Sequence, residues 1–215
     1  MIGIFGGTFD PVHYGHLKTV DYVSQALQLE QVRLVPLGMA VHREQPLATT
    51  SQRLEMLHVA TAGNPKLVVD DREIKRHGGS YTVDTLKSLK QELPGKTMCL
   101  IIGSDAFIGF HKWHQPGTIL TLAHLIVMQR PDTVLQMQTE SEELFHGHFV
   151  KTAGQLTEKP AGSILVQQVP QLNISSTEIR QRLQHGEPVN SMMPLAVYEL
   201  IRQWHLYVKD RNSTA

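Results

Sequence analysis

Residues 2–16 read Ile-Gly-Ile-Phe-Gly-Gly-Thr-Phe-Asp-Pro-Val-His-Tyr-Gly-His and combine a short apolar run, two glycines and two histidines. The apolar run at residues 2–5 predicts a brief buried strand, and Gly6 and Gly7 predict a sharp turn whose N–H groups can face an anion. A helix is expected from Tyr14 to Leu27, and a helix N-terminus carries partial positive charge. The segment therefore predicts a strand, a loop and a helix start suited to a phosphate group.

The two histidines of this segment, His13 and His16, stand three residues apart at the expected helix start. This spacing can place both imidazoles on one face of the first turn, where they could donate hydrogen bonds to the same phosphoryl group. Taken alone, the segment is equally compatible with an ordinary turn followed by solvated histidines.

A second helix start is encoded at residues 173–180, which read Asn-Ile-Ser-Ser-Thr-Glu-Ile-Arg. Ser175 is expected at the N-cap, and Glu178 is expected to complete a capping box. Ser176 and Arg180 lie one turn apart and add a hydroxyl and a guanidinium to this positive helix end. Taken alone, this segment also fits an ordinary capped helix with a surface arginine.

Together the two segments resemble the paired signatures of the nucleotidylyltransferase superfamily, His-x-Gly-His at residues 13–16 and Ile-Ser-Ser-Thr-x-x-Arg at residues 174–180. Within that superfamily the chain is most similar to the bacterial nicotinate-nucleotide adenylyltransferases. This narrower resemblance rests on Gly-Gly-Thr-Phe-Asp-Pro-Val-His at residues 6–13, on Ser80-Tyr81-Thr82, on Ile101-Ile102-Gly103-Ser104-Asp105, on Trp113 and on the total length.

The resemblance implies that the adenylyl group of ATP passes to nicotinate mononucleotide, giving deamido-NAD and pyrophosphate in NAD biosynthesis. Such a transfer needs alignment, hydrogen-bond donors and cations rather than an activated nucleophile, because the attacking phosphate is already ionised. Neither Ser175 nor Ser176 has a paired base within its motif, so in-line attack without a covalent intermediate is expected. Mg²⁺ is expected mainly on the ATP phosphates, with no protein metal ligand and with Asp10 no closer than the second coordination sphere.

The family motifs also imply which residues form the site. The implied catalytic residues are His13, His16 and Arg180. Contacts to ATP are implied for Gly6, Gly7, Thr8, Phe9, Gly103, Asp105, Ile174, Ser175 and Ser176. Contacts to the acceptor are implied for His42, Arg43, Tyr81, Thr82, Trp113 and His114, because an aromatic face with polar donors suits a pyridine carboxylate. From the residues alone, Trp113 fits a scaffold tryptophan as well, and His42 and Arg43 fit surface charges.

Two places depart from the family pattern. Residues 40–43 read Ala-Val-His-Arg instead of Pro-Pro-His and a basic residue, and Trp113-His114 replaces Trp-Tyr. Both changes bear on acceptor recognition, because a donor for the carboxylate separates an acid from an amide. Nicotinamide mononucleotide and phosphopantetheine stay open as acceptors. A regulatory module without turnover and an RNA-handling synthetase are further alternatives, disfavoured by the intact motifs and by the neutral charge.

The composition of the 215 residues excludes several classes of protein. Twenty basic and twenty acidic residues balance, so no long-range field is available for a nucleic acid. The absence of a long apolar run and of a leader peptide predicts a cytoplasmic protein without a membrane partner. The single cysteine, Cys99, is expected to be buried and reduced. The pair His146 and His148 is expected in a solvated loop rather than on a metal, and the oligomeric state stays open.

The alternation of apolar runs and helix-period segments predicts an α/β fold, a Rossmann-like doubly wound parallel sheet in a single domain of residues 1–215. Strands are expected at Ile2–Phe5, Val32–Leu37, Leu67–Val69, Met98–Ile102, Leu125–Met128 and Ile164–Val169, and helices at Tyr14–Leu27, Ser51–Ala62 and Val83–Gln91, with Ser51 and Thr82 as caps. A C-terminal helical cap of about residues 176–205 should hold two helices, Thr177–Gln184 and Leu195–Trp204. Residues 131–162 are expected to hold one helix near Ser141–Phe145. Ligands are expected at the carboxyl ends of the strands, where the loops at residues 6–12 and 103–104 meet.

Overall fold

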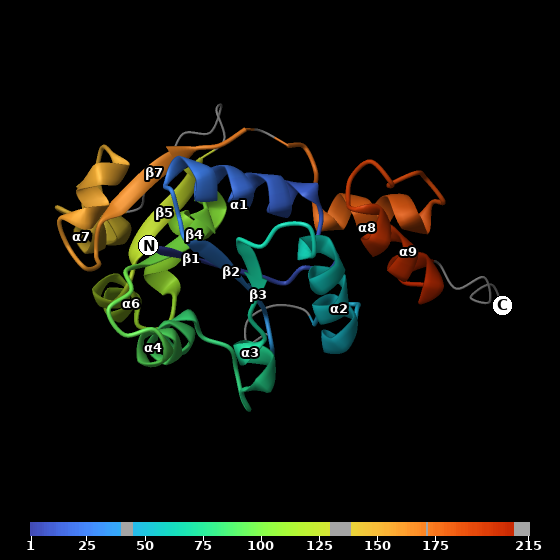
Figure 1. Ribbon diagram of the computed structural model, residues 1–215, viewed down its shortest axis with the longest axis horizontal. Helices are drawn as coiled ribbons and strands as arrows, with labels where there is room; N and C mark the ends of the chain where they lie inside the picture. The colour runs from blue at the N-terminus through green and yellow to red at the C-terminus, as the bar shows by residue number, and fades with distance from the viewer. Residues whose placement is uncertain (40–44, 130–138, 171, 209–215) are drawn as a thin grey trace.

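The computed structural model describes residues 1–39, 45–129, 139–170 and 172–208. They form a seven-stranded sheet of order β3-β2-β1-β4-β5-β7-β6, in which every strand pair is parallel (Figure 1). The strands are β1 (Ile2–Gly7), β2 (Gln31–Pro36), β3 (Leu67–Val69), β4 (Met98–Gly103), β5 (His124–Gln129), β6 (Phe149–Val150) and β7 (Ile164–Gln168). The predicted Rossmann-like α/β class is confirmed.

The central strands are apolar along most of their length because helices cover both faces of the sheet. Residues of α1 (Tyr14–Ala26) and α2 (Thr50–Thr61) share one hydrophobic cluster, and residues of α4 (Thr82–Glu92) and α6 (Pro116–Leu122) share the cluster on the opposite face. Cys99 is the second residue of β4 and is fully buried, and burial raises the pKa of its thiol to about 12. The thiol therefore behaves as a small apolar side chain, as predicted.

The chain order reverses between β1 and β4. The chain runs from β1 outward to β2 and β3, and returns to the other side of β1 with β4. Loops after β1 and β4 therefore diverge and leave a crevice at the carboxyl ends of these strands. β1 and β4 pair only as far as Ile4 and Leu100, and beyond that point Gly6, Gly7, Thr8 and Gly103 line one cavity, so the loops at residues 6–12 and 103–104 come close there.

Two C-terminal helices, α8 (Ser176–Gln184) and α9 (Leu195–Gln203), lie beside α2 in Figure 1. Ile179 of α8 and Val197 of α9 are fully buried and belong to the same hydrophobic cluster as α1 and α2. The helical cap therefore shares its core with one face of the sheet. No helix among the described residues is long and apolar enough to cross a membrane.

Several elements are shorter than a sequence pattern can detect. These are α3 (Arg72–Lys75), α5 (Ser104–Ile108), the 3-10 turns η1 (Phe110–Lys112) and η2 (Ala153–Thr157), α6 and β6. The helix expected near Ser141–Phe145 is present as α7 (Thr139–Phe145). These elements have two to seven residues and show too few periods of the apolar pattern to be recognised reliably.

Two predicted helix caps are wrong. The N-cap of α2 is Thr49 rather than Ser51, and its side chain forms a capping box with Gln52. Thr82 is the first residue of α4 rather than its cap, and Tyr81 holds the N-cap position without a side-chain hydrogen bond. The other expected strands and helices are displaced by one or two residues at their ends, as is usual where terminal turns fray.

Candidate active site

The loop after β1 does not turn where the glycines predict. Gly6 and Gly7 continue the strand, and Phe9 makes the turn in the left-handed region with a φ of 51°. The Phe9 side chain is 1 % exposed and its ring meets the edge of His16, with ring centroids 5.1 Å apart. The Phe9 ring is therefore not open to a ligand and packs against His16 instead, so the ATP contact predicted for Phe9 could be made only by its backbone.

The two histidines lie together at the start of α1. The rings of His13 and His16 are stacked, with centroids 3.8 Å apart and an interplanar angle of 27°. Their Nδ1 atoms are buried and have no hydrogen-bond partner among the described residues. Burial lowers the pKa of His13 to about 4, and burial followed by the neighbouring His13 lowers the pKa of His16. Both imidazoles are therefore neutral at neutral pH, each with one N–H to donate.

The helix start at residues 174–176 lies directly against this pair. A Cβ on Gly15 would stand 2.8 Å from the His13 ring and 2.9 Å from the Ile174 carbonyl oxygen, so only glycine allows the approach. The Ser176 hydroxyl donates to the Pro11 carbonyl over 3.0 Å. The two helix starts, at Tyr14 and Ser176, are 162 positions apart in the sequence and thus border one small region of the surface.

Arg180 joins the same loop from the first turns of α8. Its Nη1 donates to the Asp10 carbonyl over 2.8 Å, and its Nη2 donates to the Thr177 hydroxyl. Ser175 caps the helix, accepting from the Glu178 N–H. The Glu178 carboxylate pairs with Arg182 one turn on, so the second half of the predicted capping box is wrong.

Arg53 and Tyr207, which the sequence reasoning did not assign, hold this loop together with the loop's own Asp10. Arg53, which is 1 % exposed, donates to the carbonyls of Thr8 and Leu37 over 2.8 and 2.7 Å. The buried Asp10 carboxylate accepts from two backbone N–H groups, at residues 47 and 48, and from the Tyr207 hydroxyl at 2.6 Å. Since these hydrogen-bond partners lie far apart in the sequence, no local sequence pattern predicts their contacts.

A cavity of about 590 Å³ opens at the crevice between β1 and β4. Its walls bring together residues expected to bind ATP and residues expected to bind the acceptor: Gly6, Gly7, Thr8 and Gly103 with Tyr81, Thr82, Trp113 and His114. His13, His16 and Arg180 stand beyond Thr8, toward α1, rather than in the cavity wall. Asp105 is exposed on α5 and is not part of the lining. Thr8 lines the cavity and His13 lies five residues further along the same loop, so the cavity and the histidine pair are joined by this loop.

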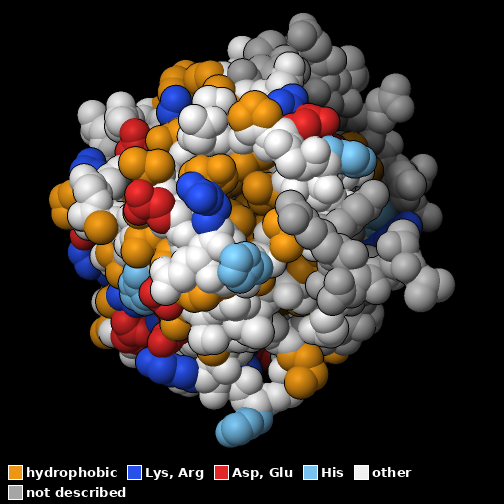
Figure 2. All heavy atoms as spheres, turned by 90° about the vertical axis from the view of Figure 1, so that its right-hand side faces the viewer, with side chains coloured by type: hydrophobic (Ala, Val, Ile, Leu, Met, Phe, Trp, Pro, Cys, Tyr) orange, Lys and Arg blue, Asp and Glu red, His pale blue; other side chains and the backbone are white. Residues whose placement is uncertain are grey.

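The acceptor side of the cavity is aromatic. The rings of Tyr81 and His114 lie 4.5 Å apart, and the half-buried Trp113 packs against Phe110 with ring centroids 5.2 Å apart. On the face seen in Figure 2, apolar side chains gather in a hollow with basic side chains and a histidine beside it. His42 and Arg43 lie outside the described residues.

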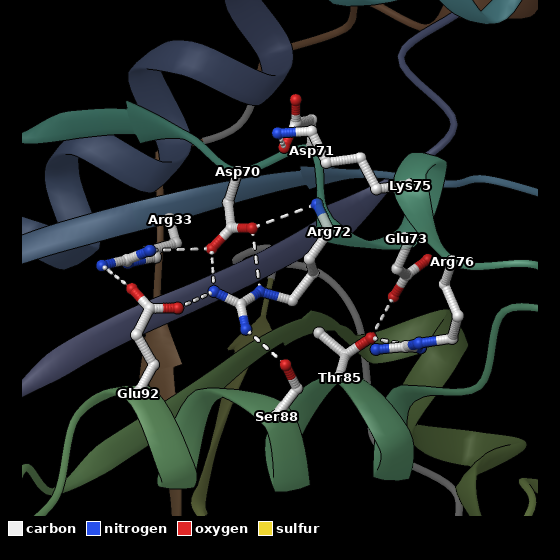
Figure 3. Close-up of polar contacts among 10 residues, drawn as sticks. All are labelled: Arg33, Asp70, Asp71, Arg72, Glu73, Lys75, Arg76, Thr85, Ser88 and Glu92. Carbon is white, nitrogen blue, oxygen red and sulfur yellow. Dashed lines mark hydrogen bonds and ion pairs between the residues drawn. The ribbon is translucent and has the colours of Figure 1, made fainter.

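A network of charged side chains around the buried Asp70 links α3 and α4 next to this cavity (Figure 3). The Asp70 carboxylate lies between Arg33 and Arg72, and Arg72 also reaches Ser88 and Glu92 on α4. Burial opposes ionisation of Asp70, but the hydrogen bonds from both arginines prevail and lower its pKa. Beside this network, Glu73 lines the cavity and was not anticipated as a site residue.

Residues 4–182 match the family model described as cytidylyltransferase-like, so the chain belongs to this class of nucleotide-transferring α/β proteins. The probable nicotinate-nucleotide adenylyltransferase of Citrobacter koseri is 43 % identical over 206 residues, covering 95 % of this chain and 97 % of the relative. The nicotinate-nucleotide adenylyltransferase of Salmonella typhimurium is 42 % identical over 206 residues, with the same two coverages. Within its class, the chain therefore belongs to the nicotinate-nucleotide adenylyltransferase family.

Solved structures agree with this fold. The Plasmodium falciparum nicotinic acid mononucleotide adenylyltransferase complexed with NaAD superposes with a TM-score of 0.72 at 20 % identity, covering 96 % of each chain. A putative nicotinate-nucleotide adenylyltransferase from Vibrio parahaemolyticus superposes with a TM-score of 0.61 at 19 % identity, covering 96 % of this chain and 94 % of the other.

Proposed function

We propose that this protein transfers the adenylyl group of ATP to nicotinate mononucleotide, releasing pyrophosphate and forming deamido-NAD. One observation carries the proposal beyond family membership. The loop that ends in His13 lines the cavity through Thr8, and its Pro11 and Asp10 carbonyls accept hydrogen bonds of 3.0 and 2.8 Å from Ser176 and Arg180. A nucleotide lying across this loop would meet donors from both helix starts.

The chemistry follows from the charges that must be brought together. The acceptor phosphate attacks the α-phosphorus of ATP in line, and negative charge develops on the departing pyrophosphate. The neutral His13 and His16 can each donate one N–H to the phosphates, and the start of α8 adds Ser176 and Arg180. Positioning and charge stabilisation replace an activated nucleophile, so no covalent intermediate on the protein is needed.

Mg²⁺ is proposed to bind through the ATP phosphates. Within residues 1–39, 45–129, 139–170 and 172–208, no group of three His, Cys, Asp or Glu side chains is placed to hold a metal. Asp10 is 4 % exposed and its carboxylate already accepts three hydrogen bonds, so it is poorly suited to a direct metal bond. The ion would neutralise phosphate charge.

The acceptor is proposed to lie at the aromatic end of the cavity. Trp113 offers a face for stacking a pyridine ring, and Tyr81, Thr82 and His114 offer polar groups around it. A cytoplasmic location and the lack of a nucleic-acid partner stay predictions from the sequence.

An acceptor panel tests the proposal. The purified protein with ATP and Mg²⁺ is given nicotinate mononucleotide, nicotinamide mononucleotide or phosphopantetheine at matched concentrations, and pyrophosphate and the nucleotide products are measured. Nicotinate mononucleotide is expected to react fastest, and His16→Ala serves as the inactive control. Faster reaction with either other acceptor, or no pyrophosphate with any of them, would overturn the proposal.

A further inference from the structure

Glu73 lines the cavity, and the mechanism proposed above assigns no role to its carboxyl group. It lies on the short helix α3 and is 9 % exposed. The same cavity is lined by Tyr81, Thr82 and Trp113, the residues proposed to receive the acceptor. An acidic group is unexpected next to a site for a carboxylate-bearing substrate, because like charges repel in a region of low dielectric.

The charge network fixes the helix that carries Glu73. Arg72 grips the Asp70 carboxylate through Nε and Nη2, each over 2.8 Å, and donates to the Ser88 hydroxyl over 2.8 Å. Figure 3 shows Arg72 reaching from α3 across to α4, with Glu92 at the far side. These contacts hold α3 between the edge of the sheet and α4.

Glu73 itself is held from two directions. Its backbone carbonyl oxygen packs on Gly38, where a Cβ would stand only 2.2 Å away. Its Oε1 accepts a hydrogen bond of 2.7 Å from the Thr85 hydroxyl on α4. The carboxyl group therefore cannot leave its place without breaking its hydrogen bond to Thr85 on α4.

The groups around the Glu73 carboxyl shift its pKa in opposite directions. Burial raises its pKa and outweighs the Thr85 and Ser80 hydroxyls, the Arg76 charge and the Gly38 backbone, all of which favour the ionised form. Arg76 reaches this group from the end of α3 through Thr85, over 3.4 Å. From the other walls, Lys112 and His114 line the cavity, together with the phenol of Tyr81. Because its pKa is raised, Glu73 binds a proton more readily than an exposed glutamate does, and an anion entering the cavity would favour the protonated form further.

Building on the proposed function, we propose that Glu73 binds a proton from the solvent when an acceptor with an anionic ring substituent enters the cavity. The new O–H bond forms on the Glu73 carboxylate, and the acceptor keeps all its bonds. An acceptor with a neutral carboxamide does not require this proton. Glu73 is therefore a specificity-determining residue that links the choice between acid and amide to proton uptake.

The sign of the pH dependence follows directly. Below the pKa of Glu73 in the free protein, the carboxyl already carries its proton, and the acid binds without uptake. Above that pKa, Glu73 must take up a proton when the acid binds, and this lowers the affinity for the acid but not for the amide. The ratio of the two affinities therefore shifts away from the acid as pH rises, by up to about tenfold per pH unit. The acceptor phosphate also titrates, but it is common to both mononucleotides and cancels in their ratio.

Isothermal titration calorimetry tests the proposal in buffers of different ionisation enthalpy between about pH 6 and pH 9. Nicotinate and nicotinamide mononucleotides are titrated into the wild-type protein saturated with a non-hydrolysable ATP analogue and Mg²⁺. The acid is expected to take up more protons than the amide, by a fraction that rises toward one with pH. In Glu73→Gln this difference should vanish, and in Glu92→Gln, which removes a carboxylate outside the cavity lining, it should persist.

Two results would overturn the proposal. One is equal proton uptake for both mononucleotides by the wild-type protein across this pH range, which needs no variant. The other is a difference in proton uptake between the two mononucleotides that persists in Glu73→Gln. The proton would then bind to another group, and Glu73 would have only a structural role. If the wild-type protein forms the dinucleotide but shows no uptake difference, only this inference fails; if it forms none, the proposed function fails.

Discussion

Removing one hydroxyl at the end of the described chain should weaken the loop that carries the histidines. Tyr207 follows α9 and is 7 % exposed, and its hydroxyl donates to Asp10 Oδ1 over 2.6 Å. Burial, and then the neighbouring Asp10, raises the pKa of Tyr207, so the phenol keeps its proton throughout the working range. Tyr207→Phe deletes this donor while keeping the ring that packs in the core.

The loss of stability in Tyr207→Phe depends on the hydrogen bonds that the Asp10 carboxylate keeps. A hydrogen bond to a charged group contributes about 1.5–3 kcal/mol. Asp10 Oδ1 keeps its bond of 3.0 Å from the Ala48 N–H, so the carboxylate is not left unpaired, and the lower half of that range applies. A loss of about 2 kcal/mol corresponds to a Tm lower by about 4–8 °C in a chain of this size. Because the loop positions His13, kcat should fall several-fold, short of the roughly 10²-fold cost of a 1 Å displacement.

Urea denaturation and initial-rate kinetics of Tyr207→Phe measure both effects. Tyr22→Phe is the matched control, because Tyr22 is 42 % exposed and its hydroxyl loss should change stability by less than about 0.5 kcal/mol. A Tyr207→Phe protein as stable and as active as the wild type would refute the reasoning, since the hydroxyl would then lend the loop no support.

Four further predictions concern the site itself. His16→Ala should lower kcat by about 10²-fold or more, the cost of one transition-state donor, without changing circular dichroism; near-normal turnover would remove this imidazole from the mechanism. Trp113→Ala should raise KM for the acceptor far more than KM for ATP, and equal changes would place the ring in the scaffold. Gly15→Ala should lower stability by about 1–3 kcal/mol in denaturant titrations and impair activity, because the new methyl would overlap the His13 ring and the Ile174 carbonyl; a stable, active variant would contradict the close approach. Burial lowers the pKa of His13 from 6.5 to about 4, so as the pH falls this histidine is protonated in the unfolded chain before it is protonated in the folded protein. The free energy of unfolding should therefore fall as the pH drops from about 6.5 to about 4. His13→Asn should make the fall shallower, and an unchanged slope would show that His13 does not cause it.

The sequence predicts those parts of the fold that depend on local residue patterns. The apolar run of β4 and the periodic pattern of α1 need no partner to be recognised, and parallel strands joined by helices leave few possible topologies. The prediction failed at the loop after β1, where Gly6 and Gly7 suggested a turn. Phe9 makes that turn instead, because the burial of its ring beneath His16 offsets the cost of a left-handed backbone.

The candidate site divides in the same way. His13, His16 and Arg180 stand in compact motifs and could be selected from the sequence. Glu73 could not, because it lies in residues 70–76, where every residue except Ile74 is charged and the composition is that of a solvated surface segment. Tyr207 is separated from Asp10 by 197 positions, and only the folded chain brings them together. Residues that support a site from distant elements leave no local signal.

The central claim is that the starts of α1 and α8 hold one triphosphate between them. A crystal structure of the protein with Mg²⁺ and a non-hydrolysable ATP analogue measures this directly, through the distances from His16 and Arg180 to the phosphate oxygens. The account predicts that both side chains lie within about 2.7–3.2 Å of oxygens of the same triphosphate. Phosphates bound elsewhere, with the Arg180 guanidinium out of their reach, would contradict it.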